Sequence, residues 1–507
     1  MGNVKFFTGY LRKIWEEQKP LAVLFKTDSS YYLYDTGTNK ILKCDSLTYD
    51  LLEKLFYEDF EPAVGAFLKK NGEDGFVKTV STLKKSIENQ DLFVLYEVTN
   101  ADLFPGKEEL QETISTMSNE LSLEVTEECN LRCIYCVHND DNRENRNHGS
   151  GNMNIETAIA AIDFLKKNSE KSHQVAIGFY GGEPFINFPV IKKSIEYAKK
   201  TFPDKKVEFS VTSNGTLLTP GIARFLFENN INVTVSIDGK EAVHDRYRKN
   251  LSGSGSYKKT VTGLRTLFKE YGARFKDKIS LYSVYAPPFS LEQIRDRTNL
   301  WEELDWLPHD IRANIVYYSG PRIPGVSHSE DTDLLQWAFE NYINSKKEET
   351  QPHPYAVSMI EKLLTVFSQR PVYKKAIDKF PLHGCCLPAH RRIFVTVSGD
   401  FRICEKIPGS APTIGNVKEG VNFDILYDKY LKEYKDMSLQ VCKKCWAINI
   451  CESCFIDGFD ENGLSYDKKM ERCESKRLAA GKKMYYFCKA LEMMPGIQDY
   501  FAATKLK

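Results

Sequence analysis

The chain has 507 residues, and its 69 basic side chains balance its 69 acidic ones. This length exceeds the size at which one hydrophobic core usually keeps growing, so we expect two to four domains. The balanced charge excludes general electrostatic capture of nucleic acid or of an anionic membrane. No apolar run approaches the ~20 residues that span a bilayer, and no secretion signal is recognisable. With thirteen cysteines and no export signal, we expect a cytoplasmic protein whose thiols bind metal.

The first 105 residues are expected to form a separate small module. The residues at 35–39 favour a turn between two strands, and Asp45 or Ser46 can cap the first helix. The expected strands are 21–25, 31–34 and 40–42, and three helices follow, one from 45–46 and two over 61–70 and 77–87. A small sheet of this kind has an exposed strand edge, which can pair with an added peptide strand.

From residue 116 to 320, β-rich runs alternate with helical stretches. Repeated β–α units need a parallel sheet with right-handed crossovers, and about six of them predict a partial barrel. Functional sites of such barrels lie at the C-terminal ends of the strands. The expected strands are 121–126, 175–180, 207–212, 233–237, 279–285 and 313–318. The expected helices are 155–167, 188–201, 220–229 and 257–271, and residues 138–154 form a polar loop.

Three cysteines, Cys129, Cys133 and Cys136, follow the first of these strands. Thiolates at CxxxCxxC spacing can hold three irons of a four-iron cluster and leave the fourth iron without a protein ligand. An open iron implies a bound substrate or cofactor, and Tyr135 supplies an aromatic face beside it. The alternatives are a structural zinc loop or buried free thiols, but zinc sites usually use four ligands.

The second strand runs into Gly181, Gly182 and Glu183. Two glycines let backbone carbonyls approach a ligand closely, and the carboxylate of Glu183 can accept hydrogen bonds from an ammonium group. This combination suits the amino group of a methionine. By itself, the same sequence could equally be an ordinary turn.

The third and fourth strands also end in polar residues. Ser213 and Asn214 follow the third strand, and their short side chains can bind ribose hydroxyls or a carboxylate. Ser236 lies near the end of the fourth, before Asp238 and Gly239, and the fork of Arg248 matches a carboxylate. Serine, asparagine and glycine also form common turns, so each motif alone is weak.

In their order along the strands, the triplet, the Gly-Gly-Glu motif and these polar residues resemble the radical S-adenosylmethionine (radical SAM) superfamily. The resemblance implies that Cys129, Cys133 and Cys136 hold a [4Fe-4S] cluster. It also implies that S-adenosylmethionine binds the open iron and yields a 5′-deoxyadenosyl radical. A reducing partner such as flavodoxin or ferredoxin would supply the electron.

A second group of cysteines lies between Cys386 and Cys473, around an expected hairpin at 391–397. Their order resembles the SPASM extension of radical SAM enzymes, in which interleaved cysteines bind two auxiliary [4Fe-4S] clusters. The resemblance assigns Cys386, Cys404 and Cys454 to the first auxiliary cluster and Cys442, Cys445, Cys451 and Cys473 to the second, making three clusters in all.

Two details of this second group stay open. The gap between Cys451 and Cys454 is one residue shorter than the usual pattern. Cys385 could be a fourth ligand, a substitute or a bystander, and a first auxiliary cluster without it would have an open iron. The alternative for the whole group is a pair of zinc ribbons. Cys44 and Cys488 lie outside every pattern and are expected to be ordinary thiols.

In this context, the first module resembles a winged-helix RiPP recognition element, which binds the leader of a precursor peptide. The expected fold class is α/β, a partial (β/α)6 TIM-like barrel between this element and a SPASM domain. The expected domains are 1–105 for leader binding, 116–320 for the barrel, 321–380 for a helical bridge, 381–480 for the SPASM domain and 481–507 for a helical tail.

This organisation resembles maturases of ribosomally made, post-translationally modified peptides. The resemblance implies hydrogen abstraction from a precursor peptide and formation of a thioether bond from a cysteine sulfur to carbon. Formylglycine formation, as in anaerobic sulfatase maturases, and carbon–carbon cross-linking are alternative reactions. A non-catalytic, metal-stapled peptide-binding scaffold is the alternative of another class. No nucleic acid or membrane is expected as a partner.

Overall fold

The computed structural model describes residues 2–101, 106–136, 138, 148–286, 290–315, 334–380 and 384–503. Its largest unit is an eight-stranded sheet with the order β11-β10-β8-β7-β6-β4-β12-β13. The first six strands of this order are parallel, which confirms the expected α/β fold with a mostly parallel sheet. These strands are β4 (Glu120–Thr126), β6 (Gln174–Gly181), β7 (Lys206–Ser213), β8 (Asn232–Ser236), β10 (Ile279–Tyr285) and β11 (Ile311–Ile315).

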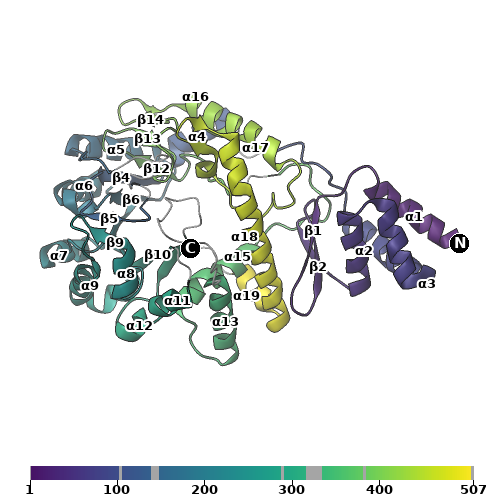
Figure 1. The fold of residues 1–507 in the computed structure, drawn as a ribbon. Coiled ribbons are helices and arrows are strands. Elements are labelled where there is room, and N and C mark those ends of the chain that lie inside the picture. The colour runs from purple at the N-terminus through teal and green to yellow at the C-terminus, as the bar shows by residue number, and fades with distance from the viewer. Residues whose placement is uncertain are drawn as a thin grey trace.

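The sheet curves, and amphipathic helices cover its outer side (Figure 1). The main outer helices are α5 (Ile155–Asn168), α6 (Phe188–Thr201), α7 (Pro220–Glu228), α8 (Glu241–Tyr247) and α9 (Tyr257–Tyr271). Side chains such as Leu123, Ile177 and Val235 are fully buried between the layers. The last strand was expected over 313–318, but β11 begins at Ile311, and residues 316–318 lie outside the described residues.

The C-terminal region adds a hairpin to this sheet. β12 (Arg392–Val395) and β13 (Phe401–Arg402) are antiparallel to each other, which confirms the expected hairpin. β12 pairs in parallel with β4, which the sequence did not predict. This pairing brings the region after β13 to the strand that precedes the cysteine triplet.

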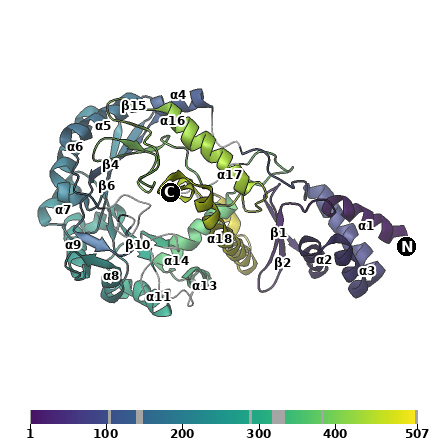
Figure 2. The ribbon, with the colours of Figure 1, turned by 45° about the horizontal axis from the view of Figure 1, so that its top comes forward.

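A long helix, α18 (Tyr466–Met493), lies between the barrel and the N-terminal module (Figure 2). The domain boundary expected at residue 480 lies inside this helix. Other elements of this half are α13 (Leu334–Lys347), α14 (Pro354–Ala356), α15 (Lys362–Ser368), β14 (Gly415–Asn416), β15 (Gly420–Val421), α16 (Phe423–Ile425), α17 (Tyr434–Cys442), β16 (Phe459–Asp460), β17 (Gly463–Leu464) and α19 (Ile497–Ala503). The remaining elements are α4 (Lys107–Met117), β5 (Leu131–Cys133), β9 (Arg248–Asn250), α10 (Phe275–Lys278), α11 (Leu291–Thr298) and α12 (Leu300–Glu303). Within the described ranges, every helix is too short or too polar to cross a bilayer.

The N-terminal module contains the three expected strands in an antiparallel sheet, followed by helices. Its elements are α1 (Gly2–Trp15), β1 (Ala22–Lys26), β2 (Tyr31–Asp35), β3 (Lys40–Cys44), α2 (Ser46–Tyr57) and α3 (Phe60–Gln90). Asp45 caps α2 by accepting a hydrogen bond from the backbone of Thr48. The two later helices are one interrupted helix, because Gly72 adopts a φ of 72° inside it. α1 was not predicted, since it buries only Leu11 and Trp15.

This module docks on the C-terminal half through a shared apolar cluster, which includes Tyr32 and Tyr34, and through polar contacts. The hydroxyls of Thr27, Ser29 and Tyr32 donate to the carboxylate of Glu492 on α18, at 2.8–2.9 Å. At the other end of the sheet, the backbone carbonyl of Thr36 accepts a 2.6 Å hydrogen bond from the side chain of Asn449. The module is therefore held at both ends of its sheet.

The turn after β2 depends on the buried carboxylate of Asp35. One oxygen accepts hydrogen bonds from the backbone and hydroxyl of Thr38, and the other accepts one from the backbone of Phe93. Asp35→Ala leaves these buried donors without acceptors, so we expect it to lower the free energy of unfolding by about 3 kcal/mol. The measurement is denaturant unfolding of the full chain. Asp28→Ala, which removes an exposed ion pair with Lys489, is the control and should change stability little. Equal losses in the two variants would contradict this account.

Candidate functional site

The cysteine triplet lies in the loop after β4, the first strand of the barrel. Part of this loop, β5, pairs with β9, which follows the fourth strand, β8, in the chain. Cys129 follows β4, and Cys133 ends β5, where it pairs with Arg248 in β9. The backbone of Cys136 then donates to the carbonyl of Cys133 at 3.0 Å. The three thiols face one another closely enough for their charges to interact. The structure thus brings together the three residues that the sequence grouped.

A buried carboxylate, Asp238, holds the triplet loop in place. Arg248 donates to both oxygens of Asp238, at 2.9 and 3.2 Å, and the hydroxyl of Tyr135 donates to one of them. The guanidinium of Arg248 also lies 5.5 Å from the ring centre of Tyr135. Two nitrogens of Arg248 are therefore already engaged, and its role as a carboxylate clamp stays a prediction. The role of Asp238 was missed by sequence reasoning, although Asp238 lies two residues after Ser236.

The triplet thiols are strongly perturbed by burial. Burial raises the pKa of Cys129 and Cys133 to about 12 and that of Cys136 to about 11. The guanidinium of Arg248 acts in the opposite direction on the pKa of Cys133 and Cys136. Metal binding must therefore release protons from these thiols, and Arg248 favours that release.

The glycines after β6 allow the backbone to pass very close to the triplet loop. Gly181 has a φ of 135°, and a Cβ at Gly182 would lie 2.2 Å from the carbonyl oxygen of Glu128. The backbone of Glu183 donates to that same carbonyl at 2.8 Å. Any larger residue at Gly182 would push the loops of the first two strands apart.

The carboxylate of Glu183 is fully buried and joins the second loop to the third. It accepts hydrogen bonds from the hydroxyl of Ser213 at 2.8 Å and from the backbone of Asn214 at 2.7 Å. Burial raises the pKa of Glu183 to about 7, against the effect of these hydrogen bonds. Its predicted contact with an ammonium group stays a prediction, because the observed bonds all run to the protein.

Asn214 in turn connects the third loop to the triplet. Its side chain donates to the side chain of Asn130 at 2.9 Å and approaches the sulfur of Cys129 at 4.0 Å. Ser236 is buried at the end of β8. The loops after the first four barrel strands, β4, β6, β7 and β8, therefore meet around the triplet, as the parallel topology requires.

Four of the C-terminal thiols surround one cavity. Cys442 and Cys445 lie at the end of α17 and just beyond it, Cys451 follows in the same loop, and Cys473 reaches the cavity from α18. Two cations, Lys469 and Arg477, line the same cavity. The structure thus assembles the four residues that the sequence assigned to one set.

The other C-terminal thiols are only partly brought together. Cys385 is half-buried, and its thiol lies 3.9 Å from the carbonyl of Ser453. A Cβ at Gly384 would lie 2.0 Å from that same carbonyl, so glycine is needed for this approach. Both Cys385 and Cys386 interact electrostatically with Cys454, although Cys386 is exposed. Cys385 is therefore as well placed beside Cys454 as Cys386 is.

Cys404 follows β13 and faces the barrel. Tyr180, at the end of β6, is influenced by the charges of both Cys136 and Cys404, while burial raises its pKa above the ordinary range. Tyr180 is thus near enough to a thiol of the triplet and to a C-terminal thiol for both charges to affect its pKa. Sequence reasoning treated it only as a strand residue, and the pairing of β12 with β4 is what reveals its place.

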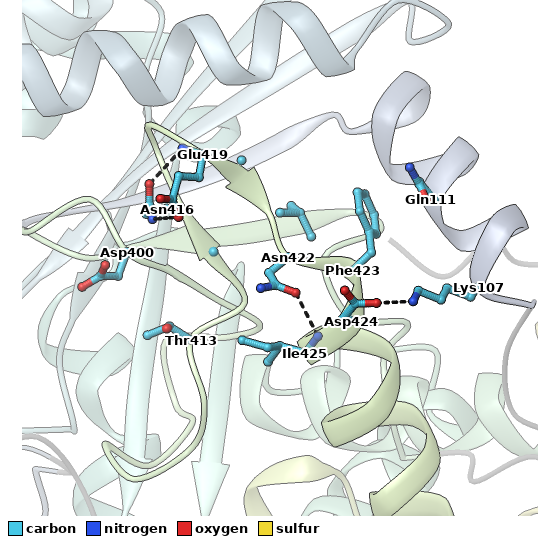
Figure 3. Close-up of a pocket in the computed structure, with 13 residues that line it drawn as sticks. Lys107, Gln111, Asp400, Thr413, Asn416, Glu419, Asn422, Phe423, Asp424 and Ile425 are labelled. Atoms are coloured by element: carbon cyan, nitrogen blue, oxygen red, sulfur yellow. Dashed lines mark hydrogen bonds and ion pairs between the residues drawn. The ribbon is translucent and has the colours of Figure 1, made fainter.

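A separate polar cavity of about 570 Å³ lies between α4 and the β14–β15 hairpin (Figure 3). Lys107 forms an ion pair with Asp424 across it, and Asn422 accepts a hydrogen bond from the backbone of Ile425. None of the cysteines lines this cavity. It is therefore distinct from the sites described above.

Comparisons with known proteins agree with this arrangement. The family profile of the radical SAM superfamily matches residues 123–296. An uncharacterised protein of Methanocaldococcus jannaschii is 29% identical over 300 residues, which cover 59% of this chain and 88% of that protein. A cysteine-type anaerobic sulfatase-maturating enzyme of Clostridium novyi is 33% identical over 143 residues, which cover 27% of this chain and only 37% of that enzyme.

The fold also resembles a solved structure. The enzyme anSMEcpe, solved with bound AdoMet and a Cp18Cys peptide, superposes with a TM-score of 0.54. The match covers 76% of this chain and 99% of that one, at 18% identity, so it supports the fold alone. With the matched profile and the loops that meet at the triplet, residues 123–296 form a radical SAM domain, and part of the chain is similar in sequence to a sulfatase-maturating enzyme.

Proposed function

We propose that this radical SAM enzyme is a peptide maturase that links a cysteine sulfur to a carbon of a ribosomally made precursor peptide. The observation that carries the proposal is the second set of four thiols around one cavity, together with the contact that the loop between Cys445 and Cys451 makes with the N-terminal module. Asn449, which contacts that module, lies between Cys445 and Cys451 of this set.

The triplet would hold a [4Fe-4S] cluster, since three soft thiol donors without a fourth ligand suit that group. With S-adenosylmethionine bound, the cluster supplies the 5′-deoxyadenosyl radical that abstracts hydrogen from the peptide. The backbone at Gly181 and Gly182 and the polar side chains at Ser213, Asn214 and Ser236 would orient S-adenosylmethionine. A reducing partner such as flavodoxin or ferredoxin would supply one electron.

The C-terminal thiols would hold two auxiliary [4Fe-4S] clusters. Within the described ranges, no three Cys, His, Asp or Glu side chains converge tightly enough to hold a single metal ion. Cys442, Cys445, Cys451 and Cys473 line one cavity, and four thiolate donors of this kind suit a four-iron cluster. An auxiliary cluster could bind the peptide thiolate or accept the electron that leaves when the carbon–sulfur bond forms.

The N-terminal module would bind the leader of the precursor. Among the described residues, β3 pairs only with β2, so its outer edge has free backbone groups that can take up a peptide strand. Apolar side chains lie exposed near this edge, with Tyr31 at 37% and Leu47 at 41% exposure. These side chains can contact a leader that lies along β3.

Formylglycine formation is the second candidate function. The sequence similarity to the Clostridium novyi sulfatase-maturating enzyme favours it, since the two chains are 33% identical over 143 residues. The two functions differ in their product, because formylglycine formation from cysteine removes the sulfur from the peptide, whereas thioether formation keeps it.

The proposed reaction is tested by incubating the reconstituted enzyme with S-adenosylmethionine, a reductant and the precursor peptide encoded beside it. Each link should lower the peptide mass by two hydrogens and remove one alkylatable thiol, as measured by intact mass and fragmentation. A mass loss with all thiols retained would indicate carbon–carbon cross-linking. Loss of sulfur would favour formylglycine formation.

The matched control for this reaction replaces Cys129, Cys133 and Cys136 with Ala. This variant should lose S-adenosylmethionine cleavage completely, because no ligands remain for the first cluster. Cleavage that survives the triple substitution would remove the radical interpretation. Uncoupled 5′-deoxyadenosine with an unchanged peptide would argue for another substrate.

Leader binding predicts a specific effect of Leu47, the second residue of α2, which lies three residues after the end of β3. Leu47→Asp should weaken binding of a fluorescent leader peptide by roughly tenfold, because it places a charge in an apolar contact. Tyr57→Asp, at the far end of α2 and 70% exposed, is the matched control and should bind the leader normally. Equal affinities of both variants and the wild type would contradict this binding site.

The buried Glu183 predicts a pH dependence of stability. With its pKa raised to about 7, the folded protein keeps a proton that the unfolded chain releases above the ordinary value of 4.5. The free energy of unfolding therefore falls as the pH rises through this window. Glu183→Gln lacks this ionisation, so the stability of the wild type relative to the variant should fall by roughly 2–3 kcal/mol between about pH 5 and about pH 7.5.

The measurement is denaturant unfolding of both proteins across this pH range. Glu228→Gln, which removes an exposed carboxyl of α7, is the matched control. Parallel pH profiles for the wild type and Glu183→Gln would show that Glu183 does not titrate in this window.

A further inference from the structure

Lys469 is a buried cation without an acidic partner. Lys469 is only 2% exposed. Among the described residues, no carboxylate forms an ion pair with its ammonium group. The ammonium instead donates to the hydroxyl of Tyr434 at 2.9 Å and approaches the hydroxyl of Ser453 at 3.5 Å. Burying an unpaired ammonium is strongly unfavourable unless negative charge lies nearby. A compensating anion is therefore expected next to Lys469.

The position of Lys469 on α18 shows where that anion lies. Lys469, Cys473 and Arg477 are spaced four residues apart, so they share one face of the helix. All three line the cavity that the thiols of the second set surround. Lys469 therefore lies on the side of α18 that faces this cavity, where the four thiolates would hold the second auxiliary cluster.

The ammonium of Lys469 also lies close to residues that neighbour the first auxiliary set, which the sequence assigned as Cys386, Cys404 and Cys454. Ser453, one of its two polar contacts, directly precedes Cys454, and the carbonyl of Ser453 lies beside the thiol of Cys385. Tyr434, the other contact, donates to the carbonyl of Cys454 at 3.0 Å. Among these thiols, burial raises the pKa of Cys385 and Cys473, and the charge of Lys469 opposes that rise in both.

We propose that Lys469 is a positioning residue shared by the two auxiliary clusters, whose buried positive charge raises the reduction potentials of both. This inference rests on the proposed auxiliary clusters. A four-iron cluster with its thiolate ligands is an anion, and one-electron reduction adds a further negative charge. A fixed cation beside the cluster therefore stabilises the reduced form more than the oxidised one.

The test is a redox titration followed by electron paramagnetic resonance. The background is the full chain with Cys129, Cys133 and Cys136 replaced by Ala, so that only auxiliary clusters give signals. Lys469→Met should lower the midpoint potential of the auxiliary signals by at least about 59 mV. This shift corresponds to a tenfold change in a one-electron reduction equilibrium. Lys469→Arg keeps the charge and should restore most of the shift. Lys482→Met removes an exposed lysine of the same helix and should leave the potentials unchanged.

Iron and sulfide are counted in every variant before the titration. If Lys469→Met loses auxiliary iron, Lys469→Gln and Lys469→Arg decide the case. Loss of iron in the Gln variant with retention in the Arg variant supports the role of the charge. Loss of iron in both variants, or unchanged potentials in a fully loaded Lys469→Met, overturns the proposal.

The iron count of the background protein separates this proposal from the proposed function. If the background protein itself binds no iron after reconstitution, the auxiliary clusters are absent, and both proposals fail. If it binds two clusters and only the potentials are insensitive to Lys469, the proposed function stands and this inference alone fails.

Discussion

The structure of the triplet loop depends on one buried carboxylate. Asp238 accepts hydrogen bonds from Arg248, from the hydroxyl of Tyr135 and from the backbone of Val284, which come from three different parts of the chain. Burial tends to raise the pKa of Asp238, but the guanidinium groups of Arg248 and Arg297 outweigh it and hold the pKa below its ordinary value. Removing one partner of such a buried ion pair costs about 3–5 kcal/mol, because the remaining charge stays buried and unpaired.

The contacts of Asp238 position the triplet loop, although none of them involves a cysteine side chain. β5 and β9 pair only over three residues, and this short contact includes Cys133 and Arg248. Because Asp238 holds Arg248, and Arg248 pairs with Cys133 across the two strands, these contacts fix the register of Cys133. The backbone at Gly182 and the side chain of Asn214 then close the loop from the second and third strands. The protein therefore holds the three partly buried thiols on one loop that contacts within the polypeptide fix in place.

The sequence predicted the parts of the fold that follow from local pattern. The β–α alternation gave the strand and helix positions of the barrel closely, because each strand is apolar and each helix has one apolar face. By resemblance, the sequence assigned Cys442, Cys445, Cys451 and Cys473 to one set, and the structure places these four thiols around one cavity, while their role as cluster ligands stays a prediction. The role of Arg248 was harder to predict, because its pairing with Asp238 depends on how β8 and β9 approach each other.

Other features could not be read from the sequence because they depend on contacts between distant segments. The attachment of β12 to β4 joins residues about 270 positions apart, and only this pairing places Cys404 near Tyr180. Likewise, Lys469 looks like an ordinary surface lysine in the first turn of a helix. Its spacing of four residues from Cys473 is a signal, but it gains meaning only once Cys473 is known to face a cavity.

The docking of the N-terminal module also has a consequence for how a peptide could be handled. Thr36 follows β2 and contacts Asn449, which lies between Cys445 and Cys451. The opposite end of the sheet contacts Glu492, on the same helix that carries Lys469 and Cys473. The sheet of the N-terminal module is thus attached to the loop and to the helix that line the cavity of the second thiol set. If β3 takes up a peptide strand as proposed, that strand would extend a sheet whose position is already fixed relative to these thiols, and the fold would meet most of the entropic cost of bringing the peptide toward them.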